Sequence, residues 1–244
     1  MTILEVNNLY KNFGGVNALS NIGFSVTEGE ILGIIGANGA GKTTLFSIIS
    51  GFYPPDKGSI RFRGDEIRGM KPYQICRKGI VRTFQVVRPF RNMTVIQNVT
   101  VGKLFGRDQR MHQGDAEREA ESIMDFVGLS SKAHILADEM TLADHKRLEL
   151  ARALTTNPQV LLLDEVLAGL TPAETSEAME IVRKVRKTMG LTILMVEHVM
   201  KAVIGLCDRI IVLHYGRMIA EGTPKEISEN PEVIEAYLGE RFEV

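Results

Sequence analysis

The chain has 244 residues, of which 44% are hydrophobic and 24% are charged, so it can bury the core of one large globular domain. Its 29 Lys and Arg residues nearly balance 30 Asp and Glu residues, and the net charge of −1 excludes a general attraction to nucleic acid. With no signal-peptide pattern, no apolar run near the roughly 18 residues of a membrane span, and two isolated cysteines (Cys76 and Cys207), we expect a cytoplasmic protein without disulfides or zinc.

Short apolar segments rich in Ile, Leu and Val predict a central parallel sheet. They are Ile31–Ile35, Val160–Leu163 and Thr192–Val196, and a loop and a helical pattern follow each of them. Strands that alternate with helices are typical of α/β domains. In the N-terminal part, Asn21–Thr27 and Gly58–Arg63 predict antiparallel strands that flank this core.

A glycine-rich loop follows the first of the apolar strands and opens a helix that runs to Ser50. It matches the pattern G-x-x-x-x-G-K-[ST] in full, and its binding residues are Gly36, Asn38, Gly39, Ala40, Gly41, Lys42, Thr43 and Thr44. Backbone N–H groups of such a loop surround phosphates, and the helix N-terminus adds its positive end. We expect Lys42 to reach the β- and γ-phosphates of a nucleoside triphosphate, and the Thr43 hydroxyl to ligate Mg²⁺.

Residues 87–152 differ in character from the segments around them. They carry Met residues, charges and short helical patterns, without strand patterns. We therefore predict one domain over 1–244, in which a helical subdomain at 87–152 is inserted between core segments 1–86 and 153–244.

The apolar strand Val160–Leu163 leads directly into two acids, Asp164 and Glu165. Charge at the end of a buried strand has to be paired or coordinated. Asp164 suits the Mg²⁺ shell, and Glu165 suits a general base that activates the attacking water. The alternative is that both acids only cap the helix that follows the strand.

Two further elements close the predicted fold. Thr171 and Glu174 form a capping-box pair at the start of a helix that Gly190 ends. Alternating residues on both sides of Tyr215-Gly216 predict a hairpin made of Ile210–Leu213 and Met218–Glu221.

Together these motifs resemble the ATPases of ATP-binding cassette (ABC) transporters, in the family's order and over nearly the whole chain. Gln85 in Arg82-Thr-Phe-Gln85 is similar to the Q-loop glutamine, which touches Mg²⁺ and senses the membrane subunits. His198 resembles the switch histidine that contacts the γ-phosphate, and Phe13 stands where an aromatic ring stacks on adenine. The resemblance implies a P-loop NTPase (RecA-like) α/β core with an antiparallel β subdomain and an inserted helical subdomain, which hydrolyses ATP with Mg²⁺.

The family's signature segment, usually Leu-Ser-Gly-Gly-Gln, is Met140–Asp144 in this chain. In the head-to-tail dimers of the family this segment faces the partner's nucleotide, and Thr141 keeps the hydroxyl for that contact. Leu142 and Ala143 replace glycines, and Asp144 fits a capping box with Thr141. Either the helix is well capped and Thr141 still contacts nucleotide, or the acid repels the γ-phosphate and weakens this half-site.

Several stretches resemble the ATPase subunits of branched-chain amino acid importers: Ala168–Pro172, Glu197–Met200, Gly205–Arg209, Gly222–Glu226 and Glu235–Gly239. This resemblance implies a second, different ATPase subunit, two membrane permeases and an extracytoplasmic solute-binding protein. The chain would then lie peripherally on the inner face of the cell membrane, without a nucleic-acid partner. Lipopolysaccharide-type exporters, amide or urea importers, and soluble ABC ATPases acting on nucleic acid or ribosomes remain alternatives.

A basic stretch extends from Arg61 to Arg91 and contains nine Lys and Arg residues against Asp65 and Glu66. It surrounds Gln85, on the part of the fold that the resemblance places toward the permease. Its simplest interpretation is a solvated charged face, and the alternative is a surface held against lipid headgroups or acidic permease loops.

Overall fold

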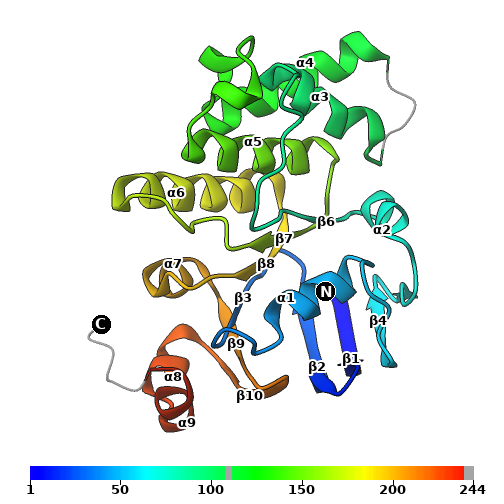
Figure 1. Cartoon of the computed structure of the whole chain (residues 1–244), viewed down its shortest axis with the longest axis vertical. Coiled ribbons are helices and arrows are strands. Elements are labelled where there is room, and N and C mark those ends of the chain that lie inside the picture. Colours follow the sequence, from blue (N-terminus) through cyan, green and yellow to red (C-terminus); the bar gives the residue numbers. More distant parts are fainter. Residues whose placement is uncertain (108–111, 239–244) are drawn as a thin grey trace. The chain divides into compact units, whose positions relative to one another are not determined.

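The computed structural model describes residues 1–107 and 112–238. Its internal contacts divide the chain into two compact units (Figure 1), of which the first combines Met1–Pro72 with Thr192–Val244 and the second is Tyr73–Leu191. The segment 87–152, predicted as a helical insert, lies inside the second unit.

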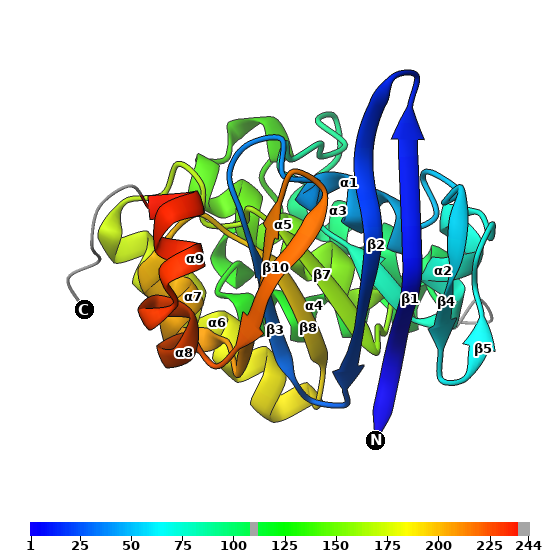
Figure 2. The same cartoon turned by 90° about the horizontal axis from the view of Figure 1, so that it is seen from below.

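An antiparallel sheet occupies the N-terminal part of the first unit (Figure 2). Its strands are β1 (Thr2–Phe13), β2 (Val16–Thr27), β4 (Lys57–Phe62) and β5 (Asp65–Glu66), in the order β2-β1-β4-β5. The two predicted strands of this region are confirmed as parts of β2 and β4. Both pair with β1, which the sequence analysis did not predict.

The parallel strands of the first unit are centred on β3 (Ile31–Ile35). It pairs with β8 (Thr192–Val196) on one side and β9 (Arg209–His214) on the other. Strand β10 (Arg217–Gly222) returns antiparallel to β9 through a two-residue turn with positive φ at both residues, so the predicted hairpin is confirmed. The strands β3 and β8 are buried along their whole length, as their apolar sequences require.

Helices of the first unit follow its strands. They are α1 (Lys42–Ile49), α7 (Met200–Leu206), α8 (Pro224–Glu229) and α9 (Pro231–Val233), with a π-helical turn at Ile234–Leu238. The helix predicted after the phosphate loop is therefore present as α1.

In the second unit, β6 (Ile80–Arg82) and β7 (Val160–Asp164) form a parallel pair. Helix α2 (Pro72–Lys78) precedes β6, and α6 (Pro172–Met189) follows β7. The predicted capping box of α6 is present, and Gly190 ends the helix in the left-handed conformation with φ of 64°.

The remaining helices of the second unit contact one another (Figure 1): α3 (Val95–Phe105), α4 (Gln113–Val127) and α5 (Leu142–Thr155), with 3₁₀ turns at Ser130–Lys132 and Ala137–Glu139. Over the described residues between 87 and 152 the structure holds helices and one isolated β-bridge. None of the described helices combines the length and the hydropathy that a bilayer span requires.

Candidate functional site

The glycine-rich loop between β3 and α1 has a backbone that side chains would obstruct. A Cβ on Gly36 would lie 2.2 Å from the carbonyl oxygen of Leu213, and one on Gly41 would lie 2.7 Å from that of Ala18. Gly36, Gly39 and Gly41 all have positive φ. Gly36 and Gly41 are required because a side chain there would meet backbone of the same unit, whereas Gly39 is favoured by its positive φ alone.

Lys42 lies inside this loop. Its buried ammonium donates hydrogen bonds to the carbonyl oxygens of Gly36, at 2.6 Å, and of Ala37, at 3.1 Å. Gly41 occupies the N-cap of α1, where no side chain caps the helix and no acid lies in the first turn. The N–H groups and positive end of α1 can therefore meet an anion such as phosphate.

The turn of the β9–β10 hairpin supports the loop from outside. The backbone N–H of Gly216 donates to the carbonyl of Ala40 at 3.0 Å, and the Gly216 carbonyl accepts from the N–H of Ser20 at 2.7 Å. Sequence reasoning predicted the hairpin but not this contact with the phosphate loop, because nothing local in the sequence connects the two segments.

We predict that Gly36→Ala weakens ATP binding roughly tenfold or more, because the added Cβ meets backbone that cannot move cheaply. The matched control is Gly39→Ala, where a Cβ meets nothing within 4 Å and only the positive φ opposes the change. Equilibrium binding of a fluorescent ATP analogue compares the two variants. Equal affinities would contradict the proposed role of the close approach at Gly36.

In the second unit, β7 ends at Asp164, whose carboxylate is buried. Arg82, at the end of the neighbouring strand β6, donates from Nη2 to Oδ2 of Asp164 at 2.6 Å, and the two side chains are only 6% and 3% exposed. Arg82 lies in the basic stretch around Gln85, yet its side chain forms this buried pair. It is thus an exception to the interpretation of that stretch as a solvated face.

Glu165 follows with φ of 50°, an uncommon conformation for a non-glycine residue. Oε2 of its carboxylate accepts a 2.6 Å hydrogen bond from the side-chain amide of Gln85. Asp164 and Glu165 therefore lie in the same unit as Gln85, the predicted Q-loop glutamine. The alternative that the two acids only cap the following helix does not fit this geometry, because residues of the 82–85 segment bind both carboxylates.

Helix α5 begins at Leu142, and Thr141 caps it as predicted. The Thr141 hydroxyl accepts from the N–H of Asp144 at 3.2 Å and donates to its Oδ2 at 2.8 Å. Asp144 is buried and forms an ion pair with Lys132. Burial by itself raises the pKa of Asp144, but the hydrogen bonds from Lys132 and Thr141 outweigh it, so its pKa lies below the ordinary value.

We predict that Asp144→Asn lowers the melting temperature at pH 7, because the amide keeps the shape but loses the ion pair. Because the pKa of Asp144 is lowered in the folded protein, its charge stabilises the fold at pH values above the ordinary Asp pKa of about 3.9. This stabilisation is lost as the pH falls through the folded-state pKa. Calorimetric scans should show a constant gap between the two proteins above about pH 5, which closes in more acidic solution. A gap that does not change with pH would rule out this role of the Asp144 charge.

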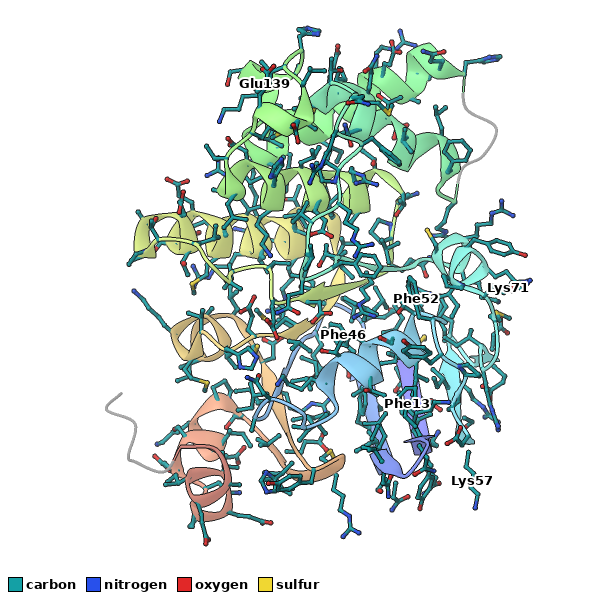
Figure 3. All side chains as sticks on the ribbon, in the orientation of Figure 1. Phe13, Phe46, Phe52, Lys57, Lys71 and Glu139 are labelled. Atoms are coloured by element: carbon teal, nitrogen blue, oxygen red, sulfur yellow. The ribbon has the colours of Figure 1, made fainter. Side chains whose placement is uncertain are left out.

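The first unit also holds the two remaining predicted site residues. Phe13, at the end of β1 (Figure 3), is half-exposed. Its ring makes a T-shaped contact with the Tyr53 ring, with the centroids 5.2 Å apart, and the Lys11 ammonium lies 5.2 Å from the Phe13 centroid. His198 is exposed and follows the buried Glu197, which comes directly after β8. The predicted residues thus divide between the units, with Gln85, Thr141, Asp164 and Glu165 in the second.

The residues predicted to hold Mg²⁺ offer the hard oxygen donors that this ion prefers. They are the Thr43 hydroxyl, the Gln85 amide oxygen and the Asp164 carboxylate. One oxygen of the Asp164 carboxylate, Oδ2, accepts from Arg82, and its second oxygen can still act as a hard donor to a cation. The donor set therefore fits the ion.

Comparison with known proteins extends the similarity over the whole chain. The profile of a family described as ABC transporter matches residues 19–168, and that of a family described as branched-chain amino acid ATP-binding cassette transporter matches residues 217–243. The chain is 44% identical to the high-affinity branched-chain amino acid transport ATP-binding protein LivG of Salmonella typhimurium, over 98% of both proteins. It is 41% identical to the corresponding protein BraF of Pseudomonas aeruginosa, again over 98% of both.

Solved structures agree with these relatives. A crystal structure of a nucleotide-free ATP-binding cassette from an ABC transporter superposes with a TM-score of 0.89 at 32% identity, over 98% of this chain and all of that one. The ADP conformation of an ATP-binding cassette superposes with a TM-score of 0.88 at 33% identity and the same coverage. The predicted α/β fold of the P-loop type is confirmed.

Proposed function

Because the chain belongs to the ABC transporter family of ATP-binding proteins, we propose that it is the ATPase subunit of a branched-chain amino acid importer. Family membership establishes that it binds ATP, hydrolyses it and works with membrane permease components. The observation that carries the narrower proposal is the 41–44% identity to LivG and BraF over 98% of their lengths, together with the C-terminal family match.

For ATP binding, we propose that the phosphate loop and Lys42 hold the phosphates while the Phe13 ring stacks on adenine. Lys42 is already directed into the loop, where phosphate oxygens would replace the carbonyls it now binds. We assign Thr43, Gln85 and Asp164 to Mg²⁺. The bound ion would supply charge neutralisation for the β- and γ-phosphates.

For hydrolysis, Glu165 is the general base that takes the proton of the attacking water. The amide of Gln85 donates to Oε2 of the Glu165 carboxylate at 2.6 Å, which orients the base and leaves its other oxygen able to accept the proton. His198, on the loop after β8, is proposed to contact the γ-phosphate. Its exposure leaves the ring accessible to nucleotide.

For assembly, we propose a head-to-tail dimer with a second, different ATPase subunit, beneath two permeases fed by an extracytoplasmic solute-binding protein. This places the chain peripherally on the inner face of the membrane. In the nucleotide site that combines the partner's phosphate loop with this chain's signature segment (Met140–Asp144), Thr141 would face the partner's nucleotide. Its hydroxyl both accepts from and donates to Asp144, which supports the weakened half-site hypothesis.

The test is Mg²⁺-dependent ATPase activity of the isolated chain as a function of protein concentration, then with the second subunit added. Turnover that stays near background until the second subunit is present supports the asymmetric pair. A rate per subunit that rises with the concentration of the chain alone would show an active homodimer, and would overturn both the obligate pair and the weakened half-site.

A further inference from the structure

One face of helix α5 holds the backbone of the segment that carries Gln85. Glu149 Oε1 accepts from the Phe84 N–H at 2.6 Å, Lys146 Nζ donates to the Gln85 carbonyl at 3.1 Å, and Arg152 Nη1 donates to the Arg88 carbonyl at 3.0 Å. These three helix residues are spaced i, i+3, i+6, which keeps them on one side of the helix. The helix therefore binds both a donor and acceptors of the 84–88 backbone.

Lys146 makes a second contact that the other two residues lack. Its ammonium also donates to the carbonyl oxygen of Glu165, at 3.2 Å, and the residue is 7% exposed. These two hydrogen bonds of the buried ammonium go to backbone carbonyls, while its charge also interacts with the carboxylate of Glu149 on the same helix. Here the two carbonyls belong to the Q-loop glutamine and to the proposed base.

The Glu165 carbonyl belongs to a residue with φ of 50°, a conformation that L-amino acids disfavour. Such a conformation persists where the surroundings hold it in place. The charged hydrogen bond from Lys146 fixes the carbonyl, and hence the peptide plane that follows the base. The amide of Gln85 holds the same residue at its carboxylate.

We propose that Lys146 is a positioning residue for ATP hydrolysis, which fixes the backbones of Glu165 and Gln85 to helix α5, the helix that Thr141 caps. The inference rests on the proposed role of Glu165 as base. Lys146 touches neither nucleotide nor water in this role, and it acts by setting where the base and the Q-loop amide point. Displacement of α5 would then move both groups together.

The first measurement is backbone hydrogen exchange of the nucleotide-free protein, followed by mass spectrometry. Lys146→Met keeps the length and removes the donor. We expect exchange in peptides covering 82–90 and 164–168 to become roughly tenfold faster or more, while the phosphate loop at 36–44 does not change. Lys146→Arg, which retains a cationic donor, should restore most of the protection. The control is Lys187→Met, an exposed position near the end of α6.

The second measurement is steady-state ATPase activity, in the assembly in which the unsubstituted protein hydrolyses ATP. Lys146→Met should lower kcat roughly tenfold and leave KM for ATP within about twofold, because the phosphate loop is not affected. A variant that is only less stable would lose total ATPase activity in proportion to the protein that is unfolded. It would show no selective loss in peptides 82–90 and 164–168, and Lys146→Arg would not specifically restore it. If Lys146→Met does not fold, Lys146→Gln removes the charge and leaves a shorter donor, and it should change exchange and kcat in the same direction by a smaller factor.

Unchanged exchange at 82–90 and 164–168, or unchanged kcat, would overturn the positioning role while leaving the proposed function intact. The role of Glu165 as the base is tested separately in the same ATPase assay, in which Glu165→Gln should abolish turnover. Full activity of Glu165→Gln would reject Glu165 as the base whatever Lys146→Met does.

Discussion

Glu165→Gln is expected to lower kcat for ATP hydrolysis roughly a hundredfold or more, because general-base catalysis typically contributes about 10²–10⁴. The amide is nearly the same size as the carboxylate and keeps an oxygen that can accept from Gln85, so the local structure should persist. Phosphate release under saturating Mg·ATP measures the loss.

Binding provides the control for this variant. The phosphate loop and Lys42 belong to the other unit, so the affinity of Glu165→Gln for ATP should stay within about threefold of the unsubstituted protein. Turnover within tenfold of normal would mean that another group removes the proton from water, and that the acid at 165 has a different role.

Arg82→Met is expected to lower the free energy of unfolding by about 3–5 kcal/mol, since it leaves the Asp164 carboxylate buried without its cationic partner. Arg82 and Asp164 are almost fully buried, so solvent screens their interaction little. Urea denaturation followed by circular dichroism measures the change.

Two further variants isolate the pair. Arg183→Met removes the exposed ion pair with Glu180 on α6 and should cost less than about 1 kcal/mol. Adding Asp164→Asn to Arg82→Met should recover part of the stability, because the unpaired charge is then gone. Equal costs for Arg82→Met and Arg183→Met would show that the buried pair contributes no more than a surface one.

Much of the fold could be predicted because local chemistry determines it. The strands at 31–35 and 192–196 are apolar except for Thr192, and both end where their hydrophobic runs end. Capping residues fixed the start of α6, and the full phosphate-loop pattern identified the turn before α1. Strand β1 escaped prediction, although Leu4, Val6 and Leu9 are buried, because its bulged pairing with β2 interrupts the simple alternation.

The contacts that support the site could not be predicted in the same way. Lys146 and Arg82 look like ordinary charged residues in a helix and a basic stretch, and only tertiary packing buries them against Glu165 and Asp164. The contact of Gly216 with Ala40 joins segments far apart in the chain. Motif residues are recognisable because their chemistry constrains a short spacing, whereas supporting residues depend on which elements meet.

The most direct test of the proposed function is uptake of labelled leucine by proteoliposomes that carry the chain with its second ATPase subunit and permeases, its solute-binding protein outside and Mg·ATP inside. We predict ATP-dependent accumulation of leucine, which unlabelled isoleucine or valine suppresses and which Glu165→Gln abolishes. Leucine uptake that is absent while the assembly hydrolyses ATP, or uptake that continues with Glu165→Gln, would contradict the proposed function.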